Sequence, residues 1–307
     1  MQAAYILKRL AYLLVTLLLT GSLVFLALRI LPGDAETLRA GLDGNPPPRT
    51  ATPSIGHQYL DWLSRLSRGD LGRSLRDDQS VLNVLGGRVG VTLSLALPTV
   101  LLSWFLAGVL AMNLVQHEGK RWANLLTGTL QTLLSAPLFW LALLLTLALA
   151  VELKWLPLLG YVSPQENLGD WLKHLILPVV SLTLPGTAFL ALSIRNLLRQ
   201  EAGQDYLRTA LSKGISRQQL LRRHALKPVM AGLLSLLALH LGGLLTGTVL
   251  IEQVFTLPGL GSALVGAVAA RDYPVVEAFA LLSLVIYGLL NLIADLGALY
   301  LDPRGRQ

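Results

Sequence analysis

The chain has 307 residues, of which 53% are hydrophobic and 14% charged, with a net charge of +7 and no cysteine. This composition excludes an ordinary soluble enzyme and a disulfide-stapled secreted domain, and it favours a single polytopic membrane domain. The basic excess does not indicate nucleic acid as a partner, because the bases lie mainly in the loops that connect apolar segments.

The first apolar segment, residues 10–28, contains no charge and is close to the roughly 20 residues that cross a bilayer. A signal peptide is the alternative, but the segment is longer than the apolar part of one, so we expect an uncleaved span. Arg29 follows directly and is placed to extend its side chain to the interface. Pro32, Gly33 and Asp34 come next and predict the end of the helix.

Residues 32–90 carry equal numbers of acids and bases and are expected to lie outside the membrane. Within them Tyr59, Trp62, Leu63 and Leu66 recur at i, i+3, i+4 and i+7. This spacing predicts an amphipathic helix that rests on the membrane surface or on another subunit.

Five further apolar segments follow, at 91–115, 122–151, 175–194, 229–251 and 278–301, and each is long enough to cross. With the first they predict six transmembrane helices, since backbone hydrogen bonds cannot be left open in lipid. Pro137, Pro178 and Pro185 indicate interruptions in the third and fourth spans.

The distribution of basic residues predicts the orientation of these spans. With the N-terminus inside the cell, 14 of the 25 Lys and Arg residues fall in cytoplasmic segments. We therefore expect both termini in the cytoplasm, together with the loop between spans four and five. The protein is expected in a membrane, in contact with lipid.

That loop, residues 200–228, is a basic amphipathic segment. Tyr206 and Ala210 share one helical face, and Gly214 suits a left-handed helix end. Ser216 begins a second helix with a capping box, and Pro228 is expected to end it. The pattern predicts two short helices joined at a glycine corner, with an apolar patch that can dock on a soluble partner.

The segment resembles the coupling loop of ABC-importer permeases, most closely that of the dipeptide, oligopeptide and nickel branch. The residues that carry this resemblance are Asp205, Tyr206, Arg208, Thr209, Ala210, Lys213 and Gly214, followed by Arg-His-Ala-Leu at 223–226. Leu211 and Ser212 replace a common Arg-Ala pair. Further landmarks of the branch are Arg29 with Pro32-Gly33-Asp34, Gly-Asp-Leu-Gly-x-Ser at 69–74, and an outer hairpin with Phe255, Pro258, Gly259, Gly261, Arg271 and Asp272.

The resemblance implies an all-helical, multi-pass type I importer permease in the inner or plasma membrane of a prokaryote, which pairs with a second homologous permease around one path. Residues 1–90 would form the first transmembrane helix and an extracytoplasmic loop, and residues 91–303 the permease domain. Two cytoplasmic ATPases would dock on Asp205–Gly214 and would bind the ATP and magnesium. An extracytoplasmic substrate-binding protein would meet residues of the outer side, namely Trp62, Gly259, Gly261, Arg271 and Asp272.

Span five contains the residues we consider for the path, His240, Gly243, Thr246 and Gly247. Small residues and hydroxyls at this spacing also suit ordinary helix packing, which remains the competing interpretation.

No phosphate-binding Gly-x-x-x-x-Gly-Lys-[Ser/Thr] motif occurs, and the five histidines show no metal-ligand spacing. We therefore expect a transport subunit without catalytic residues, metal or cofactor of its own. Peptides are the favoured substrate, and nickel or a metal chelate is the alternative within the branch. An ion-coupled secondary transporter is the rival from another class, but it predicts acids at mid-span and inverted repeats, which are not evident.

Overall fold

The computed structural model describes residues 2–30, 54–205 and 226–301, and its regular elements in these ranges are helices, with one isolated bridge between Arg73 and Ser80. The chain divides into two compact units. Unit 1 contains Met1–Val91 and Pro258–Gly288, and unit 2 contains Thr92–Leu257 and Leu289–Gln307. Residues 258–288 thus belong to the same compact unit as the N-terminal part of the chain.

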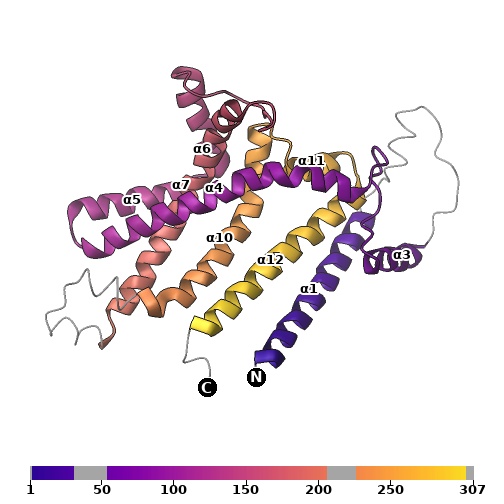
Figure 1. Ribbon diagram of the computed structural model, residues 1–307, viewed down its shortest axis with the longest axis horizontal. Helices are drawn as coiled ribbons and strands as arrows, with labels where there is room; N and C mark the ends of the chain where they lie inside the picture. Colours follow the sequence, from indigo (N-terminus) through magenta and orange to yellow (C-terminus); the bar gives the residue numbers. More distant parts are fainter. Residues whose placement is uncertain (1, 31–53, 206–225, 302–307) are drawn as a thin grey trace. The chain divides into compact units, whose positions relative to one another are not determined.

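Unit 1 is built from α1 (Gln2–Ile30), α3 (Ile55–Ser67), α11 (Leu260–Ala269) and the first parts of α4 (Val81–Gln116) and α12 (Tyr273–Leu301). In Figure 1 the first part of α12 runs beside α1. The amphipathic helix predicted around Trp62 is confirmed as α3, and Ser54 caps its N-terminus by accepting the His57 N–H. Its apolar side packs on this unit, where Phe25, Trp62 and Leu281 form a buried cluster.

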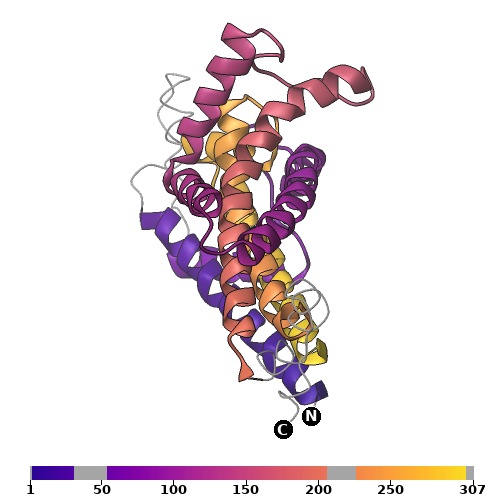
Figure 2. The same cartoon turned by 90° about the vertical axis from the view of Figure 1, so that its left-hand side faces the viewer.

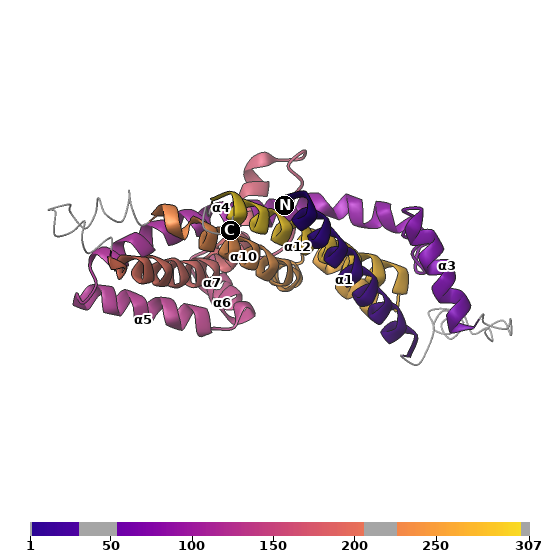
Figure 3. The same ribbon diagram turned by 90° about the horizontal axis from the view of Figure 1, so that it is seen from below.

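Unit 2 is organised around α7 (Leu168–Ala202), which contacts α5 (Arg121–Ser135), α6 (Leu138–Thr146) and α10 (Leu226–Val254). Figure 2 shows α7, in salmon, in the middle of this unit, and Figure 3 shows α5 alongside it. In α7, 61% of the most apolar stretch is buried, against 28% in α10. Asn167 caps α7 by accepting the Asp170 N–H at 3.1 Å.

Among the described residues, five helices are long and apolar enough to cross a membrane, or six if one bent pair counts as a single span. The bent pair is the third predicted span. Its first half is α5. Its second half is α6, continued by a π-helical turn, η1 (Leu147–Glu152), and the helix direction bends by 103° between the two halves. Ala136 adopts an extended backbone with ψ 136°, as expected of a residue before proline, and Pro137 has no N–H for the α5 ladder.

Other prolines act differently from the sequence-based expectation. Pro178 and Pro185 lie inside α7, which continues through both, so the predicted interruption of span four is wrong. Pro98 lies inside α4 in the same way. Pro228 does not end a short helix: it lies in the first turn of α10, where a missing N–H removes no helical hydrogen bond.

Candidate functional site

A buried ion pair joins the end of α1 to the beginning of α12 in unit 1. Arg29 Nη1 donates to Glu277 Oε1, and the two side chains are 19% and 7% exposed. The Arg29 guanidinium also lies 4.0 Å from the centre of the Phe25 ring, and its Nε donates to Gln58 Oε1 at 3.4 Å. Arg29 therefore binds within the chain, and its predicted position at the membrane interface stays a prediction.

An aromatic cluster supports this ion pair from the side of α3. The rings of Phe25, Tyr59 and Trp62 have centres 5.4 to 5.8 Å apart. Ser22 Oγ and Tyr59 Oη are 2.7 Å apart and share a hydrogen bond. Gly21 allows this close approach, since a Cβ there would lie 3.1 Å from Trp62 and 2.9 Å from Leu281. Tyr59 and Trp62 thus fix α3 against α1.

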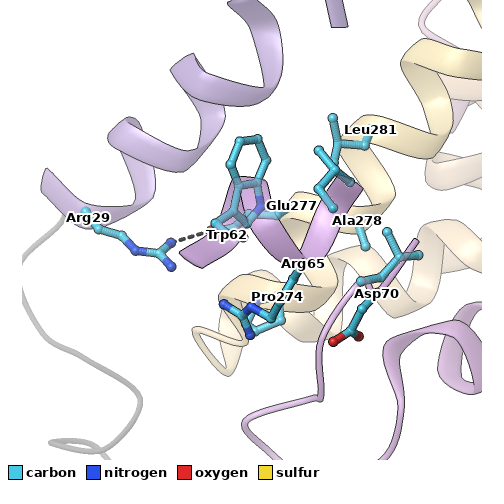
Figure 4. A pocket seen from close by; sticks show the side chains of 10 residues that line it. Arg29, Trp62, Arg65, Asp70, Pro274, Glu277, Ala278 and Leu281 are labelled. Carbon is cyan, nitrogen blue, oxygen red and sulfur yellow. Dashed lines mark hydrogen bonds and ion pairs between the residues drawn. The ribbon is translucent and has the colours of Figure 1, made fainter. Parts of the chain in front are cut away.

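A small cavity lies next to the ion pair. Its walls include both apolar and charged side chains, namely Arg29, Trp62, Arg65, Leu66, Asp70, Leu71, Pro274, Glu277, Ala278 and Leu281. Figure 4 shows Arg29 and Glu277 joined by a dashed line, with Arg65 and Asp70 among the other lining residues. The cavity volume of about 30 Å³ admits water but no peptide. This cavity is not a substrate site.

The turn at residues 69–80 is tied to the segment before α12 by Asp272. Ser74 Oγ donates to Asp272 Oδ2 at 2.5 Å, and the Leu75 N–H donates to Asp272 Oδ1 at 3.0 Å. Within the turn, Asp70 Oδ1 accepts the Gly72 N–H at 2.8 Å. Gly72 has a φ of +84°, which favours glycine. The Gly-Asp-Leu-Gly-x-Ser sequence therefore forms a structural brace inside unit 1.

Replacing Asp272 with alanine is expected to destabilise the protein by about 2 to 3 kcal/mol, because the Ser74 hydroxyl and the Leu75 N–H lose a charged acceptor while buried or partly buried. Thermal unfolding of the purified protein in detergent measures the loss. Asp61→Ala is the control, since that side chain is 62% exposed and should change stability by less than about 1 kcal/mol. Equal effects of the two changes would contradict the brace.

The predicted contact with a binding protein stays a prediction, and the structure gives the burial of its five residues. Trp62, Gly259, Gly261 and Asp272 are all buried. Arg271 alone of the five is partly exposed, with a φ of 53°. The amphipathic and turn patterns identified segments that bury one face. They could not show that the residues packed against that face belong to this same chain.

The residues considered for the path fall on two sides of α10. His240 and Gly247 are buried, and a Cβ at Gly247 would lie 3.1 Å from Leu182 of α7. Gly243 and Thr246 are exposed, in one row with Leu239. The four residues therefore do not share a face, and only the second pair can line a path outside this chain.

Sequence reasoning missed several buried polar groups. Glu252 is fully buried in α10, and its Oε1 accepts a 2.6 Å hydrogen bond from Thr92 Oγ1 of α4. Glu277 is a second such group, and an acid near the beginning of the apolar helix α12 was a usable signal. Among the described residues, no group of three or more His, Cys, Asp or Glu side chains is placed to hold a metal.

Most of the predicted ATPase-coupling residues lie outside the described residues, from Tyr206 to Gly214. Asp205 is described and is exposed. It follows the end of α7, where the Gly203 N–H bonds back to the Arg199 and Gln200 carbonyls at 3.3 Å. Beyond the loop the chain resumes as α10 at Leu226.

Comparison with known proteins gives a consistent result. Residues 91–307 match the family described as "Binding-protein-dependent transport system inner membrane component". The chain is 32% identical to the "Probable peptide ABC transporter permease protein y4tP" of Sinorhizobium fredii (strain NBRC 101917 / NGR234), over 98% of this chain and 99% of that protein. It is also 32% identical to the "Glutathione transport system permease protein GsiC" of Escherichia coli (strain K12), over 97% of each.

A solved structure described as "Inward facing conformations of the MetNI methionine ABC transporter" shares the fold. The match has a TM-score of 0.59 and 16% identity, and covers 71% of this chain and 96% of the solved chain. At this identity the likeness concerns the fold alone.

Proposed function

Because the chain belongs to the family of binding-protein-dependent transport system inner membrane components, we propose that it forms half of the path through which an ATP-driven importer takes up peptides. It is a multi-pass inner-membrane permease, a transport subunit and not an enzyme. The observation that carries the substrate class is the whole-length similarity to relatives named for peptide and glutathione transport. Glutathione is itself a short peptide, so both names point to one class.

The proposed assembly contains a second homologous permease, two cytoplasmic ATPases and an extracytoplasmic substrate-binding protein. ATP and magnesium would be held by the ATPases, which would dock on Asp205–Gly214. Both termini of this chain would lie in the cytoplasm, as the positions of the basic residues favour. Of the outer residues considered, Arg271 remains the one exposed enough to meet the binding protein directly.

The exposed side of α10 is the proposed lining of the path. Leu239, Gly243, Thr246 and Leu250 follow one another along this side, and none of them is covered by unit 2. The hydroxyl of Thr246 and the backbone of Gly243, which has no side chain, are poorly suited to contact lipid tails. They suit a water-filled path or a closely packed neighbouring helix. We therefore place the second permease opposite α10.

Reconstitution of the complete transporter in proteoliposomes tests the function. Uptake of labelled di- and oligopeptides is expected to require ATP inside the vesicles where the ATPases face inward, together with the binding protein outside. The same vesicles offered nickel, free or chelated, are expected to show no uptake. Nickel uptake with no peptide uptake would overturn the peptide assignment.

Thr246→Trp is expected to reduce peptide uptake about tenfold or more, since a barrier raised by only about 1.4 kcal/mol has that effect. The complex should still assemble, because the side chain points away from the core of unit 2. Leu101→Trp on α4 is the control, as Leu101 is 71% exposed and lies on another helix. Normal uptake by Thr246→Trp would exclude this residue from the path, and loss of the second permease would make it an interface residue.

A further inference from the structure

Three helices of unit 2 bring five buried polar side chains together, and we call this group the polar hub. Thr99 and Ser103 come from α4, Thr183 and Thr187 from α7, and His240 from α10. Their exposed fractions are 0%, 0%, 5%, 6% and 6%. The assigned function uses none of these side chains.

The hub is centred on Gly186 of α7. A Cβ at this position would lie 2.8 Å from His240 Nε2 and 3.0 Å from Ser103 Oγ. Both polar atoms therefore approach one point beside α7, close enough together for a single small molecule to bridge them. Thr183 and Thr187 flank Gly186 on the same side of the helix, one turn apart. Only glycine leaves this space open.

Most polar atoms of the hub have no hydrogen-bond partner in the protein. They are the hydroxyls of Thr99, Thr183 and Thr187 and both ring nitrogens of His240. Ser103 Oγ donates to the Thr183 carbonyl, but over 3.5 Å. Unpartnered buried polar atoms are costly and rare in native proteins, and five of them in one group point to a bound molecule.

Two prolines add to the polar character of this region. Pro185 precedes Gly186, and Pro98 precedes Thr99. Since Pro185 has no N–H, the carbonyl of Ser181 receives no helical hydrogen bond from it. In helices that contain proline, neighbouring hydroxyls or water satisfy such carbonyls.

We propose that the polar hub is a hydrated site, which binds one or more ordered water molecules between α4, α7 and α10. A neutral imidazole offers one donor and one acceptor, and each hydroxyl offers both. This mixture matches water, which needs two to four such partners. The hub contains no carboxylate for a cation and no cationic side chain for an anion.

The water serves the motion of the helices. A buried polar group that is bound to water can change its partner without losing its hydrogen bond. The helices α7 and α10 can therefore shift past each other at a low cost in free energy. Pro98 and Pro185 each remove one backbone hydrogen bond from α4 and α7 beside the hub. Bound water in the hub thus lowers the cost of relative movement of the helices within unit 2, whatever substrate is transported.

The first test is X-ray hydroxyl-radical footprinting of the wild-type transporter in detergent, because radicals formed from bound water label the side chains next to it. His240 is expected to be labelled, whereas Phe255, an apolar side chain of the same unit that is 2% exposed, is not. Labelling of His240 no greater than that of Phe255 would overturn the proposal. This experiment needs no variant and no transport.

The second test replaces Thr99 or Thr187 with valine, which keeps the shape and removes the hydroxyl. At a hydrated site each change loses a bond to water, and the unfolding midpoint should fall by about 2 to 4 °C. At a dry site each change removes an unpaired polar group, and the midpoint should rise. Thr146→Val is the control, since that hydroxyl bonds to the Ala142 carbonyl of its own helix at 2.8 Å. An unchanged or raised midpoint for the hub variants would refute hydration.

Discussion

Replacing Glu277 with leucine is expected to lower the free energy of unfolding by about 3 to 5 kcal/mol, since it leaves a buried charge without its partner. Arg29 is only 19% exposed and pairs with Glu277 directly. Its contacts with the Phe25 and Tyr273 rings and with the Gln58 amide are uncharged. Denaturation of the purified protein in mixed micelles, as a function of SDS, measures the change.

Two controls separate the ion pair from the general effect of a mutation. Asp78→Leu breaks the exposed pair of Arg73 and Asp78, whose side chains are 66% and 80% exposed, and should cost less than about 1 kcal/mol. The double change of Arg29→Met with Glu277→Leu removes both charges and should cost clearly less than Glu277→Leu alone. A double variant less stable than the single one would contradict the explanation.

The largest effect on function is expected from Ala210→Glu, which should abolish binding of the ATPases and therefore all transport. Tyr206 and Ala210 are four residues apart in a basic segment that the sequence predicts to be helical and cytoplasmic, and an aromatic residue with a small one at this spacing suits an interface anchor and its cleft. A carboxylate at Ala210 would be forced into a contact that excludes water. Size-exclusion chromatography should yield a monodisperse permease pair that lacks only its ATPases.

Neighbouring variants sharpen this test. Tyr206→Ala should weaken ATPase binding by about 2 kcal/mol or more if it is an anchor. Asp205→Ala, at an exposed position, should cost less than about 1 kcal/mol. An intact complex with Ala210→Glu would remove the residue from the interface. Aggregation of the variant would instead show that this face packs on the permease itself.

The transmembrane helices could be predicted because lipid imposes a local rule on the sequence. A span needs about 20 apolar residues in a row, and a run of that length is visible without any knowledge of its neighbours. The same holds for α3, whose apolar residues recur at helical spacing. The bend at Pro137 was signalled by the proline, but its angle depends on how α6 packs against α7, which no local pattern records.

The candidate site escaped prediction where it depends on contacts between distant segments. Arg29 and Glu277 are 248 residues apart, and Ser74 and Asp272 are 198 apart. Each residue alone matches an ordinary helix end or turn. The apolar face of α3 indicated that it packs against other residues, and in the structure these residues come from α1 and α12 of the same chain. The sequence could not predict that hydroxyls such as that of Thr187 belong to one cluster, because three separate helices contribute to the hub.

The bend between α5 and α6 bears on how the protein enters the membrane during synthesis. Each half, residues 121–135 and 138–152, has 15 residues. Since a helix rises about 1.5 Å per residue and the hydrocarbon core is about 30 Å thick, neither half crosses it alone. Each half instead packs on α7, which follows later in the chain. We therefore expect that the third span is not stably inserted when it leaves the ribosome. It should reach its final position in the membrane only after α7 has been synthesised.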